Sequence, residues 1–236
     1  MTSIYSEILA SASRGEKLLC VLVDPEKFDN TKAEAFLKRM PQNANYLLVG
    51  GSTATAQQTE QTVEALKKHS KLPIILFPGS HEQITEEADA ILFLSLLSGR
   101  NPEYLIGQQI KSVPKLQFSG LEILPTAYIL VDGGKESAVQ RVSQTEPIGQ
   151  SKVNLISETA LAGEFSGKNL VYLEAGSGAK IPVGAAIISE VKKTITIPLI
   201  VGGGIRSKEQ LQEAYTAGAD IVVIGTAFED ASFTGI

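Results

Sequence analysis

The stretch Ile197–Thr226 reads I-P-L-I-V-G-G-G-I-R-S, then a helix-like segment, then A-G-A-D-I-V-V-I-G-T. Its two short apolar runs, Leu199–Val201 and Ile221–Ile224, are rich in β-branched residues and are typical of parallel strands buried on both faces. Each run ends in glycine, which lets backbone N–H groups converge on an anion, and a following helix N-terminus adds positive potential. The stretch therefore predicts a phosphate site like the one that (β/α)₈ barrels form after their last two strands.

The composition fits a single domain over residues 1–236, since a typical barrel has ~250 residues. The net charge is −5, and the 21 Lys and Arg residues are spread along the chain, which argues against a nucleic-acid partner. The start has no signal-peptide pattern and no apolar run approaches ~18 residues, so we expect a cytoplasmic protein. The single cysteine, Cys20, cannot form an intrachain disulfide, and with few histidines any bound metal should prefer oxygen ligands.

Apolar runs alternate with helix-like segments along the chain. The predicted strands are 18–23, 46–49, 73–77, 90–94, 121–131, 170–173, 199–201 and 221–224. The predicted helices are 1–16, 31–40, 55–70, 102–112, 153–165, 185–193 and 208–217. Pro125 should bend the fifth strand, and the end after Ala227 is short for an eighth helix.

The connection between the third and fourth predicted strands breaks this pattern. Residues 78–89 include Pro78 and Gly79 and leave little room for a crossover helix. We therefore predict an α/β fold, a modified (β/α)₈ TIM barrel in which the third helix is shortened or replaced.

Polar residues follow the first two predicted strands, at the end where barrels place their active sites. Asp24 follows the first strand, and Gly50-Gly51-Ser52-Thr53 follows the second. Because these strands are neighbours in a barrel, the Asp24 carboxylate should lie beside the Ser52 hydroxyl. Together with substrate oxygens they suit a sparse Mg²⁺ site that bridges a diphosphate. The alternative is that Asp24 is only a turn residue in D-P-E-K.

The sixth predicted strand places Tyr172 and Glu174 on the same side, facing the barrel mouth. A carboxylate there can accept hydrogen bonds from substrate hydroxyls or take a proton from one that becomes a nucleophile. The alternative is a satisfied carboxylate of the barrel interior. The following Gly176-Ser177-Gly178 adds N–H groups for a second anion, so two phosphorylated substrates are expected, and no cation is evident on this side.

Eight collinear motifs span nearly the whole chain. They are V-D-P-E-K (23–27), L-V-G-G-S (48–52), F-P-G-S (77–80), A-I-L-F-L-S-L-L-S-G-R-N-P-E-Y-L-I-G (90–107), L-P-T-A-Y-I (124–129), Y-L-E-A-G-S-G-A (172–179), V-G-G-G-I-R (201–206) and G-T-A (225–227). With them the chain resembles the geranylgeranylglyceryl phosphate synthase family, which includes the bacterial heptaprenylglyceryl phosphate synthases. Leu22 stands where many members carry Lys, as in the second subgroup of the family.

The resemblance implies a prenyl transfer that depends on Mg²⁺. The 3-hydroxyl of sn-glycerol 1-phosphate is alkylated by geranylgeranyl diphosphate or another polyprenyl diphosphate, and diphosphate is released. It implies Asp24 and Ser52 as metal ligands, and we expect Glu174, with Tyr172, to orient or deprotonate the hydroxyl. The implied substrate-binding residues are Tyr172, Leu173, Glu174, Ala175, Gly176, Ser177, Gly178, Gly203, Gly204, Gly225 and Thr226. A homo-oligomer, a dimer or hexamer, and a peripheral membrane contact through the lipid substrate are also implied.

The prenyl chain needs an apolar groove, and we expect its lining in the run Ile91–Leu97 together with Phe77 and Tyr104. Each of these residues taken alone fits plain core of the fourth strand and its helix better. Two other functions remain open at this point. A sugar-phosphate isomerase or lyase could use the same phosphate site, since fold does not fix function. A scaffold without catalytic activity would require loss of the phosphate or metal positions, all of which are filled.

Overall fold

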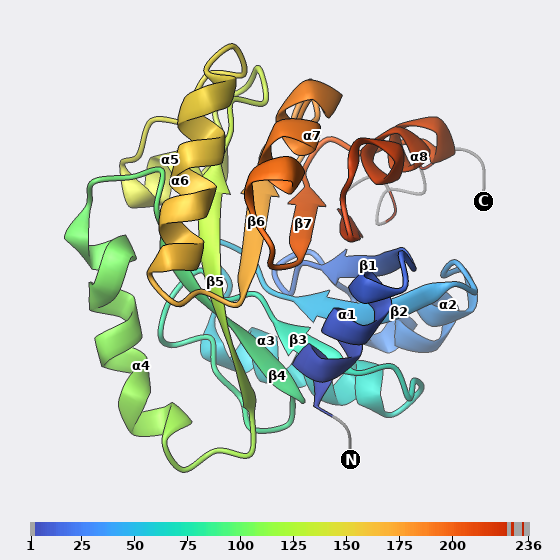
Figure 1. Cartoon of the computed structure of the whole chain (residues 1–236). Helices are drawn as coiled ribbons and strands as arrows, with labels where there is room; N and C mark the ends of the chain where they lie inside the picture. Colours follow the sequence, from blue (N-terminus) through green and yellow to red (C-terminus); the bar gives the residue numbers. More distant parts are fainter. Residues whose placement is uncertain (1–2, 226–227, 229–232, 234–236) are drawn as a thin grey trace.

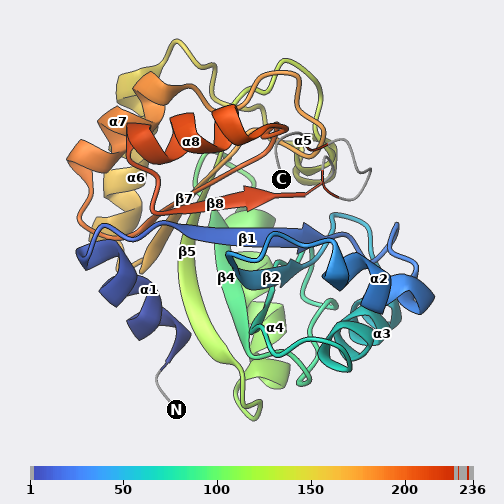
Figure 2. The same ribbon diagram turned by 90° about the vertical axis from the view of Figure 1, so that its right-hand side faces the viewer.

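Eight parallel strands form a closed barrel in chain order (Figure 1). The computed structural model describes residues 3–225, 228 and 233. The last strand pairs with the first, and Figure 2 shows the two running side by side. The strands are β1 Leu18–Val23, β2 Ala44–Val49, β3 Ile74–Leu76, β4 Ala90–Leu96, β5 Glu122–Leu130, β6 Leu170–Glu174, β7 Leu199–Gly202 and β8 Ile221–Ile224. The prediction of a (β/α)₈ TIM barrel is confirmed.

Most helices surround the barrel on its outer face, and the first helix lies at one end (Figures 1 and 2). They are α1 Ile4–Ser13, η1 Asn30–Lys32, α2 Ala33–Lys38, α3 Ala56–Lys67, η2 Glu103–Gly107, α4 Gln108–Leu116, α5 Ala138–Ser143, α6 Val153–Phe165, α7 Ala185–Thr194 and α8 Lys208–Ala217. None of the helices in the described part of the chain has both the length and the apolar character needed to cross a membrane.

The third crossover helix is replaced, as predicted. Residues 77–89, all described, form turns and bends between β3 and β4. The buried side chain of Gln83 holds this segment: its carbonyl accepts the Gly79 N–H at 2.8 Å and its amide donates to the Ala54 carbonyl at 2.7 Å. Gly79 packs so tightly on the loop after β2 that a Cβ atom there would lie 2.7 Å from the Gly51 carbonyl oxygen. The segment is therefore held against the loop after β2 and forms one side of the open end of the barrel.

Side chains alternate between the barrel interior and the layer under the helices. Along β6, Leu170 and Tyr172 belong to the interior cluster, whereas Val171 and Leu173 belong to the outer one. Every residue of β6 is buried, which explains why its sequence is continuously apolar before its last residue. Glu174 shares the parity of Tyr172, so the strand carries both side chains to the same side, as predicted.

Helix α1 closes the amino-terminal end of the barrel. Ile4 and Ile8 are buried and belong to the interior cluster. The Glu122 carboxylate at the start of β5 accepts the Ile4 and Tyr5 N–H groups at 2.6 and 2.9 Å, and an acid suits this end of the helix dipole. The opposite end of the barrel therefore remains for the site.

Strand β5 curves strongly, as Figure 2 shows. It starts beside β4, where Phe93 pairs with Pro125, and it ends beside β6. Pro125 has no N–H, but its carbonyl accepts the Asn169 N–H at 2.8 Å. The predicted bend is confirmed, and the curve lets one strand follow two neighbours in turn.

Some helix bounds differ from the prediction. The helix expected at 102–112 starts as the π-helix η2 and ends at Leu116, beyond Pro114. Proline removes one backbone hydrogen bond, but the Gln117 N–H still donates to the Val113 carbonyl at 3.0 Å and closes the last turn. Helix α5 was not predicted. The expectation of a short end after Ala227 falls largely outside the described residues.

Gly163 lets α6 approach β5 closely. A Cβ atom at this position would lie 2.6 Å from the Ala127 Cβ atom and 2.9 Å from the Leu97 Cδ1 atom. Gly163→Ala should therefore destabilise the protein by about 1–2 kcal/mol, although alanine favours a helix over glycine by about 1 kcal/mol. Thermal unfolding measures this, and Gly120→Ala is the control because that site has open space. A higher melting temperature for Gly163→Ala would contradict the close approach.

Candidate active site

A cavity of about 520 Å³ opens where the strands end. Polar and glycine residues from the loops after β1, β2, β6, β7 and β8 line one part of it, among them Asp24, Ser52, Glu174, Gly178, Gly203, Gly204 and Gly225. Another part is lined mainly by apolar side chains, among them Phe77, Ile84, Ile91, Leu92, Phe93, Leu94, Leu96 and Tyr104. The expected apolar lining is therefore found at the cavity, except for Ser95 and Leu97. One cavity thus combines anion-binding loops with an apolar channel.

The acidic part of the cavity lies at the ends of β1 and β2. The Asp24 carboxylate, 17% exposed, pairs with Lys27 at 2.8 Å and accepts the Glu26 N–H at 3.1 Å. Glu26 in turn accepts the Thr53 hydroxyl at 2.6 Å. Gly51 permits this packing, because a Cβ atom there would lie 2.5 Å from Asp24 Oδ1. Strand pairing and the shared cavity confirm that Asp24 and Ser52 follow neighbouring strands.

The corner formed by Asp24 and Ser52 can hold a hard cation only if a bound ligand supplies further oxygen atoms. Within the described residues, no group of three or more His, Cys, Asp or Glu side chains could enclose a metal ion. Carboxylate and hydroxyl oxygens from Asp24 and Ser52 are the donor types that Mg²⁺ prefers, and Mg²⁺ commonly completes its octahedron with waters and substrate phosphates. Lys27 already balances the charge of Asp24, so a cation here would displace or share that ion pair.

Glu174 is a buried carboxylate at the base of the cavity, only 5% exposed. Burial raises its pKa from about 4.5 to about 7, while the Gly176 N–H, donating to Oε1 at 2.5 Å, acts in the opposite direction. The nearby Tyr172 hydroxyl also opposes the rise in pKa. That hydroxyl is fully buried and, among the described residues, has no hydrogen-bond partner of ordinary geometry. A buried hydroxyl of this kind calls for a ligand or a water.

Three aromatic rings form the interior floor of the cavity. The Tyr172 ring stacks on Phe77 with centroids 5.2 Å apart and meets Tyr128 edge-on at 5.4 Å. Burial raises the pKa of both tyrosines well above the ordinary value, so both hydroxyls stay protonated at neutral pH. Gly202 leaves room for this arrangement, since a Cβ atom there would lie 2.5 Å from the Tyr172 hydroxyl oxygen.

Glycines with positive φ shape the anion-binding part. Gly178, Gly203 and Gly204 have φ values of 67°, 84° and 75°, which favour glycine. A Cβ atom at Gly203 would lie 2.5 Å from Glu174 Oε1 and 2.6 Å from the Gly176 nitrogen. Among the residues that the structure describes, no oxygen accepts a hydrogen bond from the N–H groups of Gly178, Gly203 or Gly204. These N–H groups can therefore bind a phosphate.

Most of the predicted site residues line this cavity. Those that do are Asp24, Ser52, Tyr172, Glu174, Ser177, Gly178, Gly203, Gly204 and Gly225. Leu173 and Ala175 instead belong to the outer cluster, and the Ala175 N–H donates to the Gly202 carbonyl at 3.0 Å. The Gly176 N–H is bonded to Glu174. Leu173, Ala175 and Gly176 therefore support the loop from behind and do not line the cavity. Thr226 lies outside the described residues.

Sequence reasoning missed several charged residues of the cavity. Lys135 and Arg206 line it, from the loops after β5 and β7. The Arg206 guanidinium donates to the Gly178 and Ala179 carbonyl oxygens at 3.3 and 2.6 Å. Arg206 belongs to the quoted V-G-G-G-I-R motif, so that motif could have revealed it. Lys135 follows the fifth strand in D-G-G-K-E-S, a loop outside all of the quoted motifs.

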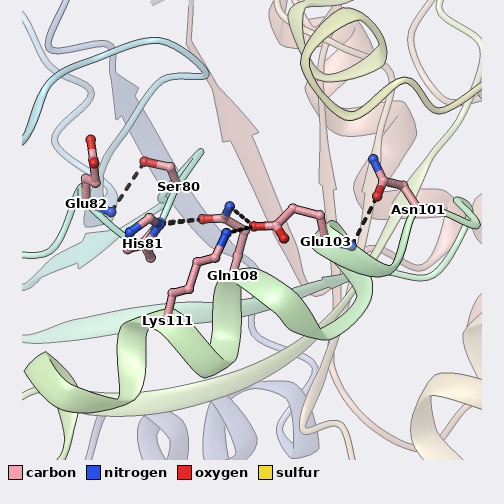
Figure 3. A network of polar contacts seen from close by, with 7 residues as sticks. All are labelled: Ser80, His81, Glu82, Asn101, Glu103, Gln108 and Lys111. Carbon is pink, nitrogen blue, oxygen red and sulfur yellow. Dashed lines mark hydrogen bonds and ion pairs between the residues drawn. The ribbon is translucent and has the colours of Figure 1, made fainter.

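A polar network ties the segment 77–89 to η2 and α4 (Figure 3). The His81 backbone N–H donates to Gln108 Oε1 at 2.7 Å, and His81 Nδ1 lies 3.0 Å from the same oxygen. The Gln108 amide donates to Glu103 Oε1 at 2.6 Å, and Lys111 pairs with that oxygen at 2.5 Å. Because Gln108 Oε1 only accepts, His81 carries a hydrogen on Nδ1. The network joins two walls beside the apolar channel.

The fold and the site together define a TIM barrel whose cavity joins glycine loops suited to a phosphate with an apolar part. A family model described as the PcrB family matches residues 13–234. The chain therefore belongs to the PcrB family.

Relatives over nearly the full length agree with this assignment. The geranylgeranylglyceryl phosphate synthase of Zunongwangia profunda is 58% identical over 233 residues, which are 99% of this chain and 100% of that protein. The protein of the same name from Pyrococcus abyssi is 46% identical over 91% of this chain and 85% of its own length. The crystal structure of (S)-3-O-geranylgeranylglyceryl phosphate synthase from Thermoplasma acidophilum, in complex with the substrate sn-glycerol-1-phosphate, has a TM-score of 0.90. It is 34% identical and covers 97% of this chain and 92% of its own.

The buried carboxyl of Glu174 should make stability depend on pH. Because its pKa of about 7 in the folded protein exceeds the ordinary value of about 4.5, the folded state keeps a proton that the unfolded state releases. Stability is therefore lost as pH rises from about 4.5 to about 7. Glu174→Gln removes this effect. The free energy of unfolding of the variant minus that of the native protein should therefore be about 2–3 kcal/mol larger at pH 8 than at pH 5.

Urea unfolding of both proteins at the two pH values measures this difference. Glu158→Gln, which changes an exposed acid of α6, is the control and should show no such gain. An equal stability difference between Glu174→Gln and the native protein at both pH values would contradict the raised pKa.

Proposed function

We propose that this protein is a prenyltransferase that joins a polyprenyl group to the 3-hydroxyl of sn-glycerol 1-phosphate. The observation that carries the proposal is the single cavity in which glycine loops, an oxygen-rich corner and an apolar channel meet. Membership of the PcrB family and the likeness to the Thermoplasma acidophilum enzyme with its bound substrate support it. We propose geranylgeranyl diphosphate as the prenyl donor.

The glycerol phosphate binds at the loops after β6 and β7. The N–H groups of Gly178, Gly203 and Gly204 hold its phosphate and so fix the distance of its 3-hydroxyl from the base of the cavity. Glu174 accepts the hydrogen of that hydroxyl, and a pKa of about 7 suits a group that takes up a proton near neutral pH. The Tyr172 hydroxyl, which lies near Glu174 and has no partner of ordinary geometry among the described residues, gives the glycerol a hydrogen-bond donor.

The reaction forms one bond and breaks one bond. The oxygen of the 3-hydroxyl attacks the allylic carbon, the bond from that carbon to the diphosphate oxygen breaks, and the proton passes to Glu174. Positive charge develops on the allylic carbon and negative charge on the diphosphate. The buried rings of Tyr128 and Tyr172 form the floor of the cavity and help to exclude water from it.

The diphosphate binds in the acidic corner at β1 and β2. Asp24 and Ser52 would hold Mg²⁺ together with diphosphate oxygens, and the ion would supply positive charge for the leaving group. Leu22 lines the cavity beside this corner and offers no charge. Since Lys27 pairs with Asp24, it adds a second positive charge near the leaving group.

The prenyl chain lies in the apolar channel. Phe93 and Leu94 of β4 and Tyr104 of η2 are partly exposed and line the cavity. Partly exposed apolar side chains at the end of a barrel are unfavourable in water, so an apolar substrate stabilises them. A sugar phosphate, the substrate of the isomerase or lyase alternative, would leave this channel wet.

Product analysis tests the function directly. We expect an ether product from the twenty-carbon diphosphate and sn-glycerol 1-phosphate, and little from sn-glycerol 3-phosphate. Fifteen- and thirty-five-carbon diphosphates report how far the channel extends. Chromatography of the labelled lipid measures the outcome. A preference for sn-glycerol 3-phosphate, or no transfer from any of the three diphosphates, would refute the proposal. Such a result would favour the alternative of a sugar-phosphate isomerase or lyase.

Asp24→Asn tests the proposed metal site. We expect turnover to fall at least 100-fold, because the loss of charge stabilisation for the leaving diphosphate raises the barrier by about 3 kcal/mol or more. Chelation of Mg²⁺ should give the same loss in the native protein. Asp29→Asn, an exposed acid in the same loop, is the matched control. Full turnover of Asp24→Asn would remove its metal role.

A further inference from the structure

Lys135 brings a positive charge to the glycine loops from an element outside them. Its Nζ atom lies 3.7 Å from the position that a Cβ atom would take at Gly178. Both residues line the same cavity. We propose that Lys135 is a substrate-binding residue that pairs with the phosphate of the glycerol phosphate. This inference rests on the proposed function for the identity of that substrate.

The loop that carries Lys135 is fixed on both sides of it. The Gly133 carbonyl accepts the Lys180 and Ile181 N–H groups at 2.9 and 3.0 Å. A Cβ atom at Gly133 would lie 2.2 Å from the Ala175 carbonyl oxygen, so only glycine permits this contact. The loops after β5 and β6 are thus docked together by their backbones.

Two further contacts hold the residues next to Lys135. The Gly134 N–H donates to Asp132 Oδ1 at 2.8 Å. On the other side, the buried Ser137 caps α5 by accepting the Gln140 N–H at 3.1 Å, and it packs against Gly176. The backbone around Lys135 is therefore held in place, and its exposed side chain brings the ammonium group beside Gly178.

The charges around Lys135 leave its ammonium group for a ligand. Among the described residues, no oxygen accepts a hydrogen bond from Lys135 and no acid pairs with it. The adjacent Glu136 pairs with Arg141 at 3.6 Å instead. Arg206 adds a second positive charge, but its guanidinium group already donates hydrogen bonds to the Gly178 and Ala179 carbonyl oxygens. Lys135 therefore brings an ammonium group to the glycine loops after β6 and β7.

This geometry supplies what the glycine loops lack. N–H groups orient a phosphate through hydrogen bonds but carry no net charge, whereas Glu174 places a carboxyl group close to Gly203. A nearby cation offsets the repulsion between that carboxylate and a doubly charged phosphate. Lys135 should therefore favour glycerol phosphate over uncharged glycerol.

The test uses Lys135→Gln in the full-length protein. We expect the Michaelis constant for sn-glycerol 1-phosphate to rise about tenfold, because one charge-assisted hydrogen bond at a partly exposed site is lost. The turnover number and the Michaelis constant for the prenyl diphosphate should stay within about twofold of the native values. Lys135→Arg, which keeps the charge, should restore most of the affinity.

Lys180→Gln is the matched control, because Lys180 carries the same charge on the next loop, is exposed and does not line the cavity. Calorimetric titration with inorganic phosphate and with sn-glycerol 1-phosphate, without any prenyl diphosphate, measures binding apart from catalysis. We expect Lys135→Gln alone to weaken both, and the effect to shrink at high salt. Equal affinities for the Lys135→Gln and Lys180→Gln variants would overturn the inference.

The two proposals fail in different ways. Weaker phosphate binding by Lys135→Gln in a protein that transfers no prenyl group would overturn the proposed function and leave the phosphate site in place. Normal prenyl transfer with an unchanged Michaelis constant for glycerol phosphate in Lys135→Gln would overturn the role of Lys135 and leave the proposed function in place.

Discussion

The site depends on one constraint, the closure of eight parallel strands into a ring. Closure gives each strand a side chain that points inward at every second residue and brings all the carboxyl ends to one rim. Tyr172 and Glu174 point inward because they share a parity, and burial by the same ring raises the pKa of Glu174 to about 7. The proton-accepting group of the proposed reaction is therefore a product of the architecture as much as of the residue type.

The sequence allowed the fold to be predicted well, for physical reasons. Strands buried on both faces read as continuous apolar runs, and their glycine-rich ends mark the loops that approach ligands. The replaced third helix could be predicted because Pro78 and Gly79 lie in a gap too short for a crossover. Helix α5 escaped prediction because its six residues, Ala138–Ser143, are too few to show a clear helical period.

The site could be predicted only in part. Asp24, Ser52 and Glu174 were accessible because each directly follows or ends a strand. Lys135 was not, because its position depends on the contact of Gly133 with Ala175, residues far apart in the chain. Leu173 and Ala175 point away from the cavity because side chains alternate along the strand and into the loop. The resemblance assigned every residue of the motif to substrate binding and did not take this alternation into account.

The turns that replace the third helix allow the lipid-binding part of the cavity to change independently of the part that binds the glycerol phosphate. In a complete ring of helices, an extended hydrocarbon would have to fit inside the barrel, where the interior rings of Phe77, Tyr128 and Tyr172 already fill the space. In the proposed reaction, the prenyl chain would instead leave along the side of the cavity that β4 and α4 line. For the proposed enzyme, substitutions on that side, at Phe93 or Ser112 for instance, would change the length of lipid accommodated and leave the residues around the glycerol phosphate unchanged.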